Sequence, residues 1–477
     1  MRKHRTKDRL RYQEIADIVT GQIHGNLMPG EKLPSVRRLS RQEKVSVTTV
    51  LHAYEILENQ GLITSKSGSG YYVRRKPGQN LPEPSVIQPP ASPSFVNIDR
   101  TVLQILGNIR QKNLISFGAA LPSSELLPNH SLNKITAKLS RQKDNALIQY
   151  ENPFGNFNLK RQLSRYSADW GRHLSPDEFT ITAGCTEALS LSLRASVRSG
   201  GVVAVESPVY YGILMILAGL GFKALEIPSN PSGGPSISTL EKLFKQKNID
   251  ALLLTSNFSN PLGSLISDED KEKIADLSGR HKIPIIEDDI YGDLYFKGKR
   301  PVTIHSFDKK GMVLLCSSFS KSIAPGFRVG YAVPGRFEDE FRKIKFMSTG
   351  STTTMSQLIL AEYLSGGGYD RHMQNLRKSF HDQILTGGNL IENYFPEGTR
   401  ISRPQGGMVL WVELPKDKDS YKLYLRALKE NISIVPGYIF SSSKNYKNCF
   451  RLSCGFPWTE QNRNALKRLG EIAAERL

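Results

Sequence analysis

The chain of 477 residues has few cysteines and no long apolar segment. Its cysteines are Cys185, Cys316, Cys449 and Cys454. None forms a C-x-x-C pair or a zinc-ligand spacing, so we expect no disulfide scaffold and no metal site. The longest apolar run, Tyr210 to Phe222, has about 13 residues, short of the roughly 18 that a membrane span needs. The basic start, Met1 to Gln13, lacks the apolar region of a secretory signal, which predicts a soluble cytoplasmic protein.

Positive charge is concentrated near the N-terminus. The first 80 residues hold 15 lysines and arginines and 7 acidic residues, a net charge of +8, whereas the other 397 residues carry +11. A basic module at one end is typical of a nucleic-acid-binding domain. Charge alone leaves an ordinary solvated basic face as the alternative.

Residues 9–74 show the pattern of a winged helix. Helical periodicity covers Tyr12–Ile23, and two further helices are predicted over Ser35–Gln42 and Ser46–Gln60. Each of these last two begins with a serine that can cap it. Leu62–Lys66 and Tyr71–Arg74 then predict two strands joined by a glycine-rich turn.

The third predicted helix has an apolar stripe, and the residues outside this stripe are polar. The stripe, expected to pack in the core, is Val47, Val50, Leu51, Tyr54 and Leu57. A winged helix places this helix in the major groove, while the preceding helix and the wing contact the backbone. The residues predicted to face DNA are therefore Arg37, Arg38, Ser46, Thr48, Thr49, His52, Lys66, Gly68 and Gly70. Hydroxyl groups suit phosphates and base edges but discriminate weakly between bases.

Four segments resemble the GntR-type winged helix: Leu33–Leu39, Val45–Val50, Ala53–Gly61 and Gly68–Gly70. The resemblance implies a DNA-binding domain over residues 10–74. Members often carry an arginine early in the recognition helix, where this chain has Val47. Base readout would then rest on Arg37, Thr48, Thr49 and His52. The alternative is a domain that packs without binding DNA.

Beyond the predicted winged helix the composition changes twice. Residues 75–94 contain six prolines, which predicts an extended, semi-rigid linker over 75–111. From residue 112 onward short apolar strands alternate with helical stretches, a pattern typical of a largely parallel α/β sheet, and residues 375–477 predict a smaller α+β lobe. The strands are expected near Phe179–Ala183, Val202–Glu206, Ala251–Thr255, Ile283–Glu287, Met312–Cys316 and Arg328–Val333. The predicted domains are 9–74, 75–111 and 112–477.

Polar motifs follow these predicted strands. Gly184-Cys185-Thr186 opens a helix whose free N–H groups could bind phosphate. Tyr210 could stack on a planar ligand or pack in the core, and Asn260 lies in what could be an ordinary turn. Three acidic residues, Glu287 to Asp289, are costly at the end of an apolar strand unless they are paired. A buried carboxylate can hold a heterocyclic nitrogen in its protonated form, as a pyridoxal cofactor requires.

The last motif of this series is Ser318-x-x-Lys321, followed by Arg328. A desolvated lysine can form a Schiff base, and an arginine binds phosphate through two parallel hydrogen bonds. The same Ser-x-x-Lys spacing occurs in serine acyl-enzymes. Those enzymes also need S-D-N and K-T-G segments, which this chain lacks.

Together these motifs resemble the fold-type I aminotransferases over residues 112–475, in the same order along the chain. The resemblance implies a pyridoxal 5'-phosphate cofactor with Lys321 as its Schiff-base lysine and Asp288 as the partner of its pyridinium nitrogen. Asn260 and Tyr291 would hydrogen-bond the phenolate oxygen of the cofactor. Tyr210 would stack on its ring.

The resemblance also implies contacts to the phosphate, the substrate and a second subunit. The phosphate would be held by Cys185, Thr186, Ser318 and Arg328. The cysteine departs from the more usual serine, so its backbone N–H could be the group that counts. Arg451 matches the arginine that binds a substrate α-carboxylate. Tyr150 lies in the segment that reaches the phosphate of the neighbouring subunit, which implies a homodimer.

A GntR-type winged helix joined to an aminotransferase-like domain resembles the MocR type of transcriptional regulator. This resemblance implies binding to operator DNA under the control of an amine, amino acid or B6-vitamer effector. The alternative is an active aminotransferase with an appended DNA-binding domain, in which Lys321 is the general base and Arg451 clamps the substrate carboxylate. A third interpretation, a repressor with an empty pocket, fits poorly with an intact Lys321, Asp288 and Arg328.

Overall fold

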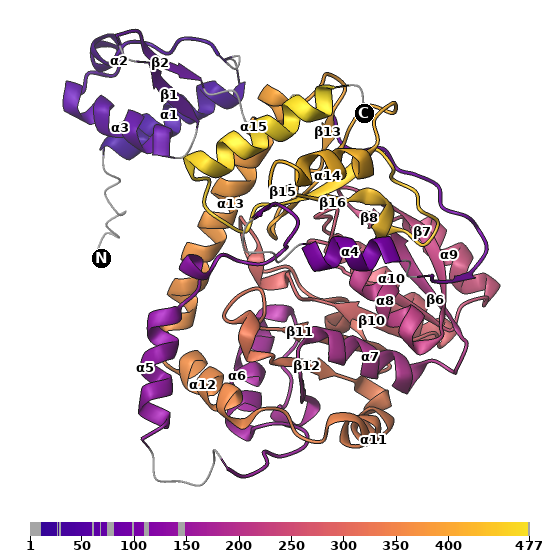
Figure 1. The fold of residues 1–477 in the computed structure, drawn as a ribbon. Coiled ribbons are helices and arrows are strands. Elements are labelled where there is room, and N and C mark those ends of the chain that lie inside the picture. The colour runs from indigo at the N-terminus through magenta and orange to yellow at the C-terminus, as the bar shows by residue number, and fades with distance from the viewer. Residues whose placement is uncertain are drawn as a thin grey trace. The chain divides into compact units, whose positions relative to one another are not determined.

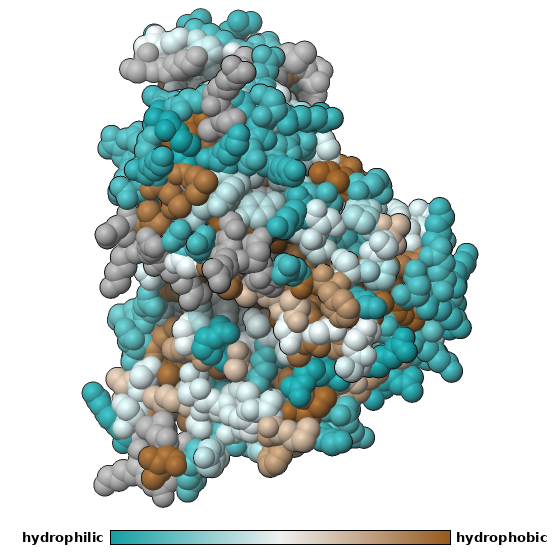
Figure 2. All heavy atoms as spheres, turned by 45° about the vertical axis from the view of Figure 1, so that its right-hand side comes forward, coloured by the Kyte–Doolittle hydropathy of each residue, from teal (hydrophilic) through white to brown (hydrophobic). Residues whose placement is uncertain are grey.

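A computed structural model describes the chain over residues 11–25, 27, 30–59, 62–66, 68–73, 81–97, 100–108, 114–141 and 148–475. The chain divides into two compact units, one ending at residue 80 and the other beginning at Leu81 (Figure 1). None of the helices in the described ranges combines the length and apolarity needed to cross a membrane. On the face shown in Figure 2, hydrophobic residues form separate patches among hydrophilic ones.

The smaller unit is the predicted winged helix. Its elements are α1 (Arg11–Gly25), α2 (Val36–Glu43), α3 (Val47–Asn59), β1 (Ile63–Lys66) and β2 (Gly70–Val73). The two strands pair antiparallel, with Ile63 opposite Val73. Both predicted caps are present, because the hydroxyls of Ser35 and Ser46 accept the backbone N–H of Arg38 and Thr49.

The predicted apolar stripe of α3 is wrong at two positions. Val50, Tyr54 and Leu57 are fully buried, whereas Val47 is 45% exposed and Leu51 is 37% exposed. The buried side of α3 is completed by Ala53. The helical period places 47 and 51 next to this buried arc but outside it. Sequence periodicity alone could not separate the two groups because all are apolar.

The larger unit is built on a mixed sheet with the strand order β3-β7-β6-β9-β10-β11-β12-β5, and β8 pairs with β7. Strands β7, β6, β9, β10 and β11 are mutually parallel, whereas β3, β8, β12 and β5 make antiparallel pairs. The bounds are β3 Ser94–Phe95, β5 Thr180–Thr182, β6 Val202–Ser207, β7 Lys223–Asn230, β8 Gly234–Pro235, β9 Ala251–Leu254, β10 Ile285–Asp288, β11 Val313–Ser318 and β12 Gly330–Val333. The predicted α/β fold is confirmed, since the central pairs are parallel.

Helices cover both faces of this sheet (Figure 1). On one face α7 (Cys185–Ser196), α8 (Tyr211–Leu220) and α11 (Glu338–Thr349) pack against Val203 and Val205. On the other face α9 (Ile237–Gln246) and α10 (Asp268–His281) pack against Ala204. Successive residues of β6 therefore enter opposite cores, as the two-residue period of a strand requires. Further helices are α5 Asn129–Leu139, α6 Phe157–Ser167, α12 Thr354–Ser365 and α13 Gly368–Tyr394.

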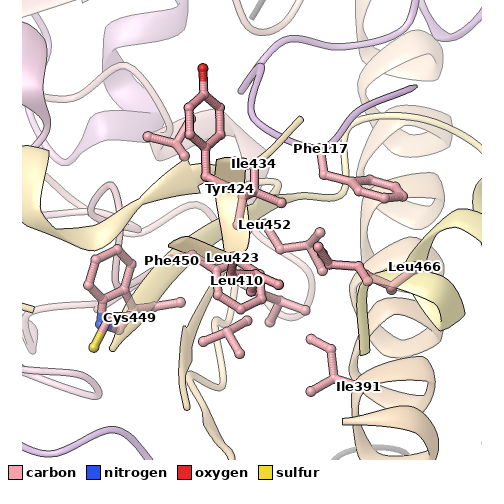
Figure 3. Packing of buried hydrophobic residues seen from close by; sticks show 14 of the residues in the cluster. Phe117, Ile391, Leu410, Leu423, Tyr424, Ile434, Cys449, Phe450, Leu452 and Leu466 are labelled. Carbon is pink, nitrogen blue, oxygen red and sulfur yellow. The ribbon is translucent and has the colours of Figure 1, made fainter. Parts of the chain in front are cut away.

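The C-terminal part forms the predicted α+β lobe. Its sheet has the order β13-β14-β17-β16 and packs with α14 and α15 around the core shown in Figure 3. A short parallel pair joins β4, from the start of the larger unit, to β15. The bounds are β4 Ile115–Ser116, β13 Arg400–Ile401, β14 Val409–Glu413, α14 Ser420–Leu428, β15 Ile432–Ser433, β16 Val435–Pro436, β17 Cys449–Ser453 and α15 Glu460–Ala474.

Much of the segment expected to be a linker packs on the larger unit. The backbone N–H and the hydroxyl of Ser85 donate to Glu413 at 2.6 and 3.1 Å, and β3 pairs with β7. Helix α4 (Arg100–Asn108) follows and buries Val102 and Ile105 in the lobe core. The prolines keep this segment extended. Its carbonyls and apolar side chains nevertheless contact the rest of the larger unit. Of residues 75–111, those at 75–80, 98–99 and 109–111 lie outside the described part of the chain.

Candidate functional site

A cavity of about 920 Å³ lies in the larger unit, at the carboxyl ends of β10 and β11. Ligands of open α/β sheets bind at this edge. All the predicted cofactor and effector residues except Tyr150 line it: Cys185, Thr186, Tyr210, Asn260, Asp288, Tyr291, Ser318, Lys321, Arg328 and Arg451. They come from segments spread over more than half of the chain, and the sheet brings them to one place.

Of the three consecutive acidic residues, only Asp288 lines the cavity. The carboxylate of Glu287 accepts the backbone N–H groups of Ile304 and His305 at 2.8 and 2.9 Å. Asp289 forms a buried ion pair with Arg300. The flanking acids are thus structural, because their side chains have partners away from the cavity.

Asp288 is buried and has few partners. Its carboxylate accepts the thiol of Cys185 at 3.3 Å and the backbone N–H of Ile290 at 3.2 Å. Burial raises the pKa of Asp288 to about 6, an effect that the hydrogen bond from Cys185 partly offsets. A cationic group in the cavity would favour its ionised form.

Lys321 follows β11 and is half-buried. Its Nζ donates to the carbonyl of Ala120 at 2.7 Å. Ala120 belongs to the segment after β4, whose neighbouring carbonyl at Gly118 accepts a hydrogen bond from Arg451. The segment from Gly118 to Leu121 therefore contacts two cations of the site.

The N-terminus of α7 forms one corner of the cavity. The N-cap of α7 is Gly184, which has φ of 91°. Because glycine has no side chain, it cannot accept a hydrogen bond from the first N–H groups of the helix. A Cβ on Gly184 would lie 2.6 Å from the guanidinium of Arg328. Glycine therefore lets the arginine cross the helix end. Thr186 and Arg328 are exposed there, and Ser318 is buried beside them.

Arg451 is fully buried on β17. One guanidinium nitrogen donates to Asn260 Oδ1 at 3.0 Å, and Asn260 Nδ2 donates to the hydroxyl of Tyr291 at 3.4 Å. The Nε atom of Arg451 is buried without a hydrogen-bond partner. This chain of contacts links the lobe to the cavity, with unused hydrogen-bonding capacity at the arginine.

Two adjacent tyrosines line the cavity. Tyr210 and Tyr211 lie with ring centroids 4.6 Å apart, and the guanidinium of Arg451 lies 5.7 Å from the Tyr211 ring. The alternative that Tyr210 packs in the core holds only in part, because this residue is half-buried and lines the cavity.

A second cavity of about 600 Å³ holds none of the predicted residues. Phe319, two residues before Lys321, lines it. The aromatic side chains that line this cavity already contact one another or a cation, since Trp170 stacks on Tyr331 at 5.5 Å and the guanidinium of Arg300 lies 5.4 Å from the Trp170 ring. Among the described residues no group of histidine, cysteine and acidic side chains could hold a metal ion.

In the winged helix the predicted DNA-facing residues are mostly exposed. Arg37, Arg38, Ser46, Thr48 and His52 are exposed, whereas Thr49 is half-buried. The hydroxyl of Ser46 is engaged with the hydroxyls of Thr48 and Thr49 at 3.0 and 2.8 Å. These hydroxyls are therefore held together at the start of α3.

The other predicted residues have structural roles beside any contact with DNA. The His52 ring stacks on Tyr12 with centroids 4.5 Å apart. Gly68 and Gly70 have φ of 70° and 113°, so the turn of the wing itself requires glycine. For Lys66 only the backbone is described, and it pairs with Gly70.

Comparison with known proteins agrees with both units. A family profile described as aminotransferase class I and II matches residues 121–469, and one described as bacterial regulatory proteins, gntR family, matches residues 11–73. The chain belongs to the aminotransferase class I and II family. Its N-terminal gntR domain confirms the arrangement expected for the MocR type.

Two relatives match this chain over nearly its whole length. The uncharacterized HTH-type transcriptional regulators YjiR and YdcR of Escherichia coli K12 are 38% and 35% identical. The alignments cover 97% of this chain and 98% of YjiR, and 98% of this chain and 100% of YdcR. A kynurenine aminotransferase from Pyrococcus horikoshii, solved in complex with PMP, has a TM-score of 0.74 and 27% identity, covering 80% of this chain and 96% of its own.

Tyr150 is not among the residues that line the cavity. Tyr150 is 98% exposed, and the neighbouring Ile148 is also exposed. The expectation that Tyr150 serves a second subunit stays a prediction.

Several lining residues were missed by sequence reasoning. They are Ala119, Ala120, Leu121, Leu189, Tyr211, Thr255, Ile290, Ser320, Pro325 and Gly326. Tyr211 could have been found, since it adjoins Tyr210 before a helix. Ala120 acts through its carbonyl, which no side-chain motif marks.

Proposed function

We propose that this chain is a pyridoxal 5'-phosphate-dependent transcriptional regulator that binds double-stranded DNA. Its aminotransferase-like domain senses an amine, an amino acid or a B6 vitamer. The observation that carries the proposal is one cavity that gathers Lys321, Asp288 and Arg328, in a chain that also has a gntR domain. Relatives named as transcriptional regulators match nearly the full length, which favours regulation over metabolism.

The corner at α7 fits a phosphate group. The helix end is uncapped by Gly184, and a Cβ there would collide with Arg328. Free N–H groups at a helix start favour anions, and Arg328 adds charge-assisted hydrogen bonds. Thr186 and Ser318 would supply hydroxyl donors. The thiol of Cys185 points to Asp288 instead, so only its backbone N–H would serve the phosphate.

The middle of the cavity fits a pyridine ring. When bound, pyridoxal phosphate supplies an aldehyde that reacts with amines and a ring that accepts electrons. Asp288 would hold the proton on the ring nitrogen, since a buried carboxylate gains most from a cationic partner. Tyr291 and Asn260 would donate to the ring oxygen, and Tyr210 would cover one ring face.

Lys321 would bind the cofactor covalently through Nζ. Nζ donates to the carbonyl of Ala120 in this structure, and attachment to the cofactor would compete with that contact. An incoming amine that displaces Lys321 would return that contact. The hydrogen bonding of Ala120 would therefore differ between the two states.

Arg451 would receive the carboxylate of an amino-acid effector. Its Nε has no partner although the side chain is fully buried, and such a group gains free energy from an anionic acceptor. An effector that lacks a carboxylate would leave this site unused.

The segment from Gly118 to Leu121 provides a route from the cavity to the connection with the winged helix. Its carbonyls contact Arg451 and Lys321. Upstream in the chain lie α4 and the packed segment 81–97, which leads to residue 80. An effector changes DNA binding only if it binds two conformations unequally. We propose that residues 75–111 transmit this difference between domains 9–74 and 112–477.

We further propose a cytoplasmic homodimer in which Tyr150 completes the phosphate site of the neighbouring subunit. The exposure of Tyr150 and Ile148 supports this arrangement. A second candidate function is transamination. It is favoured by the presence of both Lys321, as a general base, and Arg451 in one cavity.

The first test is the visible absorption of the purified protein loaded with pyridoxal phosphate, compared with Lys321→Ala. We expect the wild type to show the band of a lysine-bound cofactor and the variant to lose it. The same band in the variant would show that Lys321 is not the attachment site. Conversion to the pyridoxamine form by an amino acid, reversed by a keto acid, would favour transamination.

A further inference from the structure

The recognition helix α3 exposes two aliphatic side chains on its outward face. Val47 is 45% exposed and Leu51 is 37% exposed. They lie one turn apart, so they form one apolar strip on the N-terminal half of the helix. In the smaller unit the other side of α3 is buried against α1 and α2, which fixes this strip on the outside.

The apolar strip is next to the polar groups that favour DNA. Thr48 and His52 occupy the adjoining exposed positions of α3, and the exposed Arg37 and Arg38 are on α2. The two exposed arginines of α2 favour a polyanion as the occupant of this surface. Residues at the start of a recognition helix lie nearest to the base edges of the major groove.

Aliphatic groups can recognise only one feature of a base edge there. They neither donate nor accept hydrogen bonds, and the 5-methyl group of thymine is the apolar group in the major groove. We propose that Val47 and Leu51 form a thymine-reading strip that contacts thymine methyl groups. This inference rests on the proposed binding of α3 in the major groove.

The aliphatic pair adds to the base readout predicted for Arg37, Thr48, Thr49 and His52. The hydroxyls of Thr48 and Thr49 contact Ser46, and the ring of His52 stacks on Tyr12. These contacts fix the polar groups in place. Val47 and Leu51 form no hydrogen bonds through their side chains, and they select thymine through shape and desolvation.

The test begins with DNA duplexes that full-length protein selects from a random library. Thymines of the selected half-site are then replaced one at a time by deoxyuridine, which lacks only the methyl group. We expect affinity to fall roughly three- to fivefold at one or two positions, the factor that burial of one methylene-sized group supplies. Replacing cytosine by 5-methylcytosine at a weakly binding site should restore part of the affinity.

The protein side of the cycle uses Val47→Ala, Leu51→Ala and the double variant. The ratio of the affinities for thymine and deoxyuridine duplexes should fall toward one in these variants and should be kept in Val47→Ile. Val47→Arg should shift the preferred base toward guanine, because arginine pairs with the O6 and N7 atoms of guanine. Ile18→Ala removes another exposed aliphatic side chain, from α1, and should leave the ratio unchanged.

The outcomes separate this inference from the proposed function. Selection of no DNA at all would overturn both. DNA binding with equal affinity for thymine and deoxyuridine duplexes would overturn the thymine-reading strip and leave the regulator intact. Variants that change self-association in sedimentation, without changing the thymine to deoxyuridine ratio, would show that the strip contacts another copy of the chain.

Discussion

The predicted functional side chains of the winged helix are mostly exposed, whereas those of the cavity in the larger unit include buried charged groups. On α3 the outward face combines hydroxyls with the exposed Val47 and Leu51. In the cavity Asp288 and Arg451 are buried, at 5% and 0% exposure. A buried charge costs free energy unless it is paired, so a buried charged group that lines a cavity with few partners points to function. An exposed side chain costs little wherever it lies, and its role must be inferred from its neighbours.

The largest effect that would sharpen this comparison is expected at Arg451. Arg451→Met should weaken the spectral response to amino acids by one to two orders of magnitude, since hydrogen bonds to charged groups contribute about 1.5–3 kcal/mol. Amines without a carboxylate should respond nearly as in the wild type. The measurement is a titration of the cofactor band with matched amino acids and amines.

Arg161→Met provides the control, because Arg161 is an exposed arginine of the same unit. An equal loss for amines and amino acids in Arg451→Met would mean that Arg451 supports the cavity without binding a carboxylate.

The same contrast explains how much the sequence could predict. The fold was predicted from apolar strands that alternate with helical stretches. Half of the cavity lining was predicted from polar residues near the ends of these strands, which are costly without a partner, and from the resemblance to the aminotransferases. Ala120 and Gly118 could not be predicted, since they act through backbone carbonyls. Val47 and Leu51 were placed in the core because periodicity does not distinguish an exposed aliphatic side chain from a buried one. The packed course of residues 81–97 depends on distant partners such as Glu413.

An intermediate effect is expected from a buried carboxylate near the cavity. Burial raises the pKa of Glu206 to about 8, whereas an unfolded chain loses this proton near pH 4.3. The folded protein therefore holds a proton that the unfolded chain has lost, and the free energy of unfolding falls as pH rises through this window. Glu206→Gln should remove a contribution of the order of a few kcal/mol across it.

This pH dependence is measured as the midpoint of thermal unfolding of cofactor-free protein between pH 5 and 8, a range that lies within the window from about 4.3 to about 8. Burial also raises the pKa values of Glu287 and Asp288, to about 7 and about 6. Glu206→Gln should therefore flatten mainly the upper part of the curve of stability against pH. An unchanged slope between pH 7 and 8 in the variant would contradict the account.

The smallest effect is expected on the exposed side of the comparison. Arg37→Ala should weaken DNA binding and lower the slope of log affinity against log salt by roughly one, the contribution of one phosphate contact. Arg161→Ala removes the same charge from the larger unit and should leave the slope unchanged. Equal slopes for wild type and Arg37→Ala would remove Arg37 from the phosphate contacts.

The central claim is that the cavity controls the DNA-binding unit. Its most direct test is the affinity of full-length protein for a selected duplex, with and without an amino acid that changes the cofactor band. We expect that amino acid to change the affinity of the wild type several-fold and to have no effect on Lys321→Ala. Identical DNA affinity of the wild type with and without the amino acid, together with conversion to the pyridoxamine form that a keto acid reverses, would contradict this claim. The protein would then be an enzyme with an uncoupled DNA-binding domain.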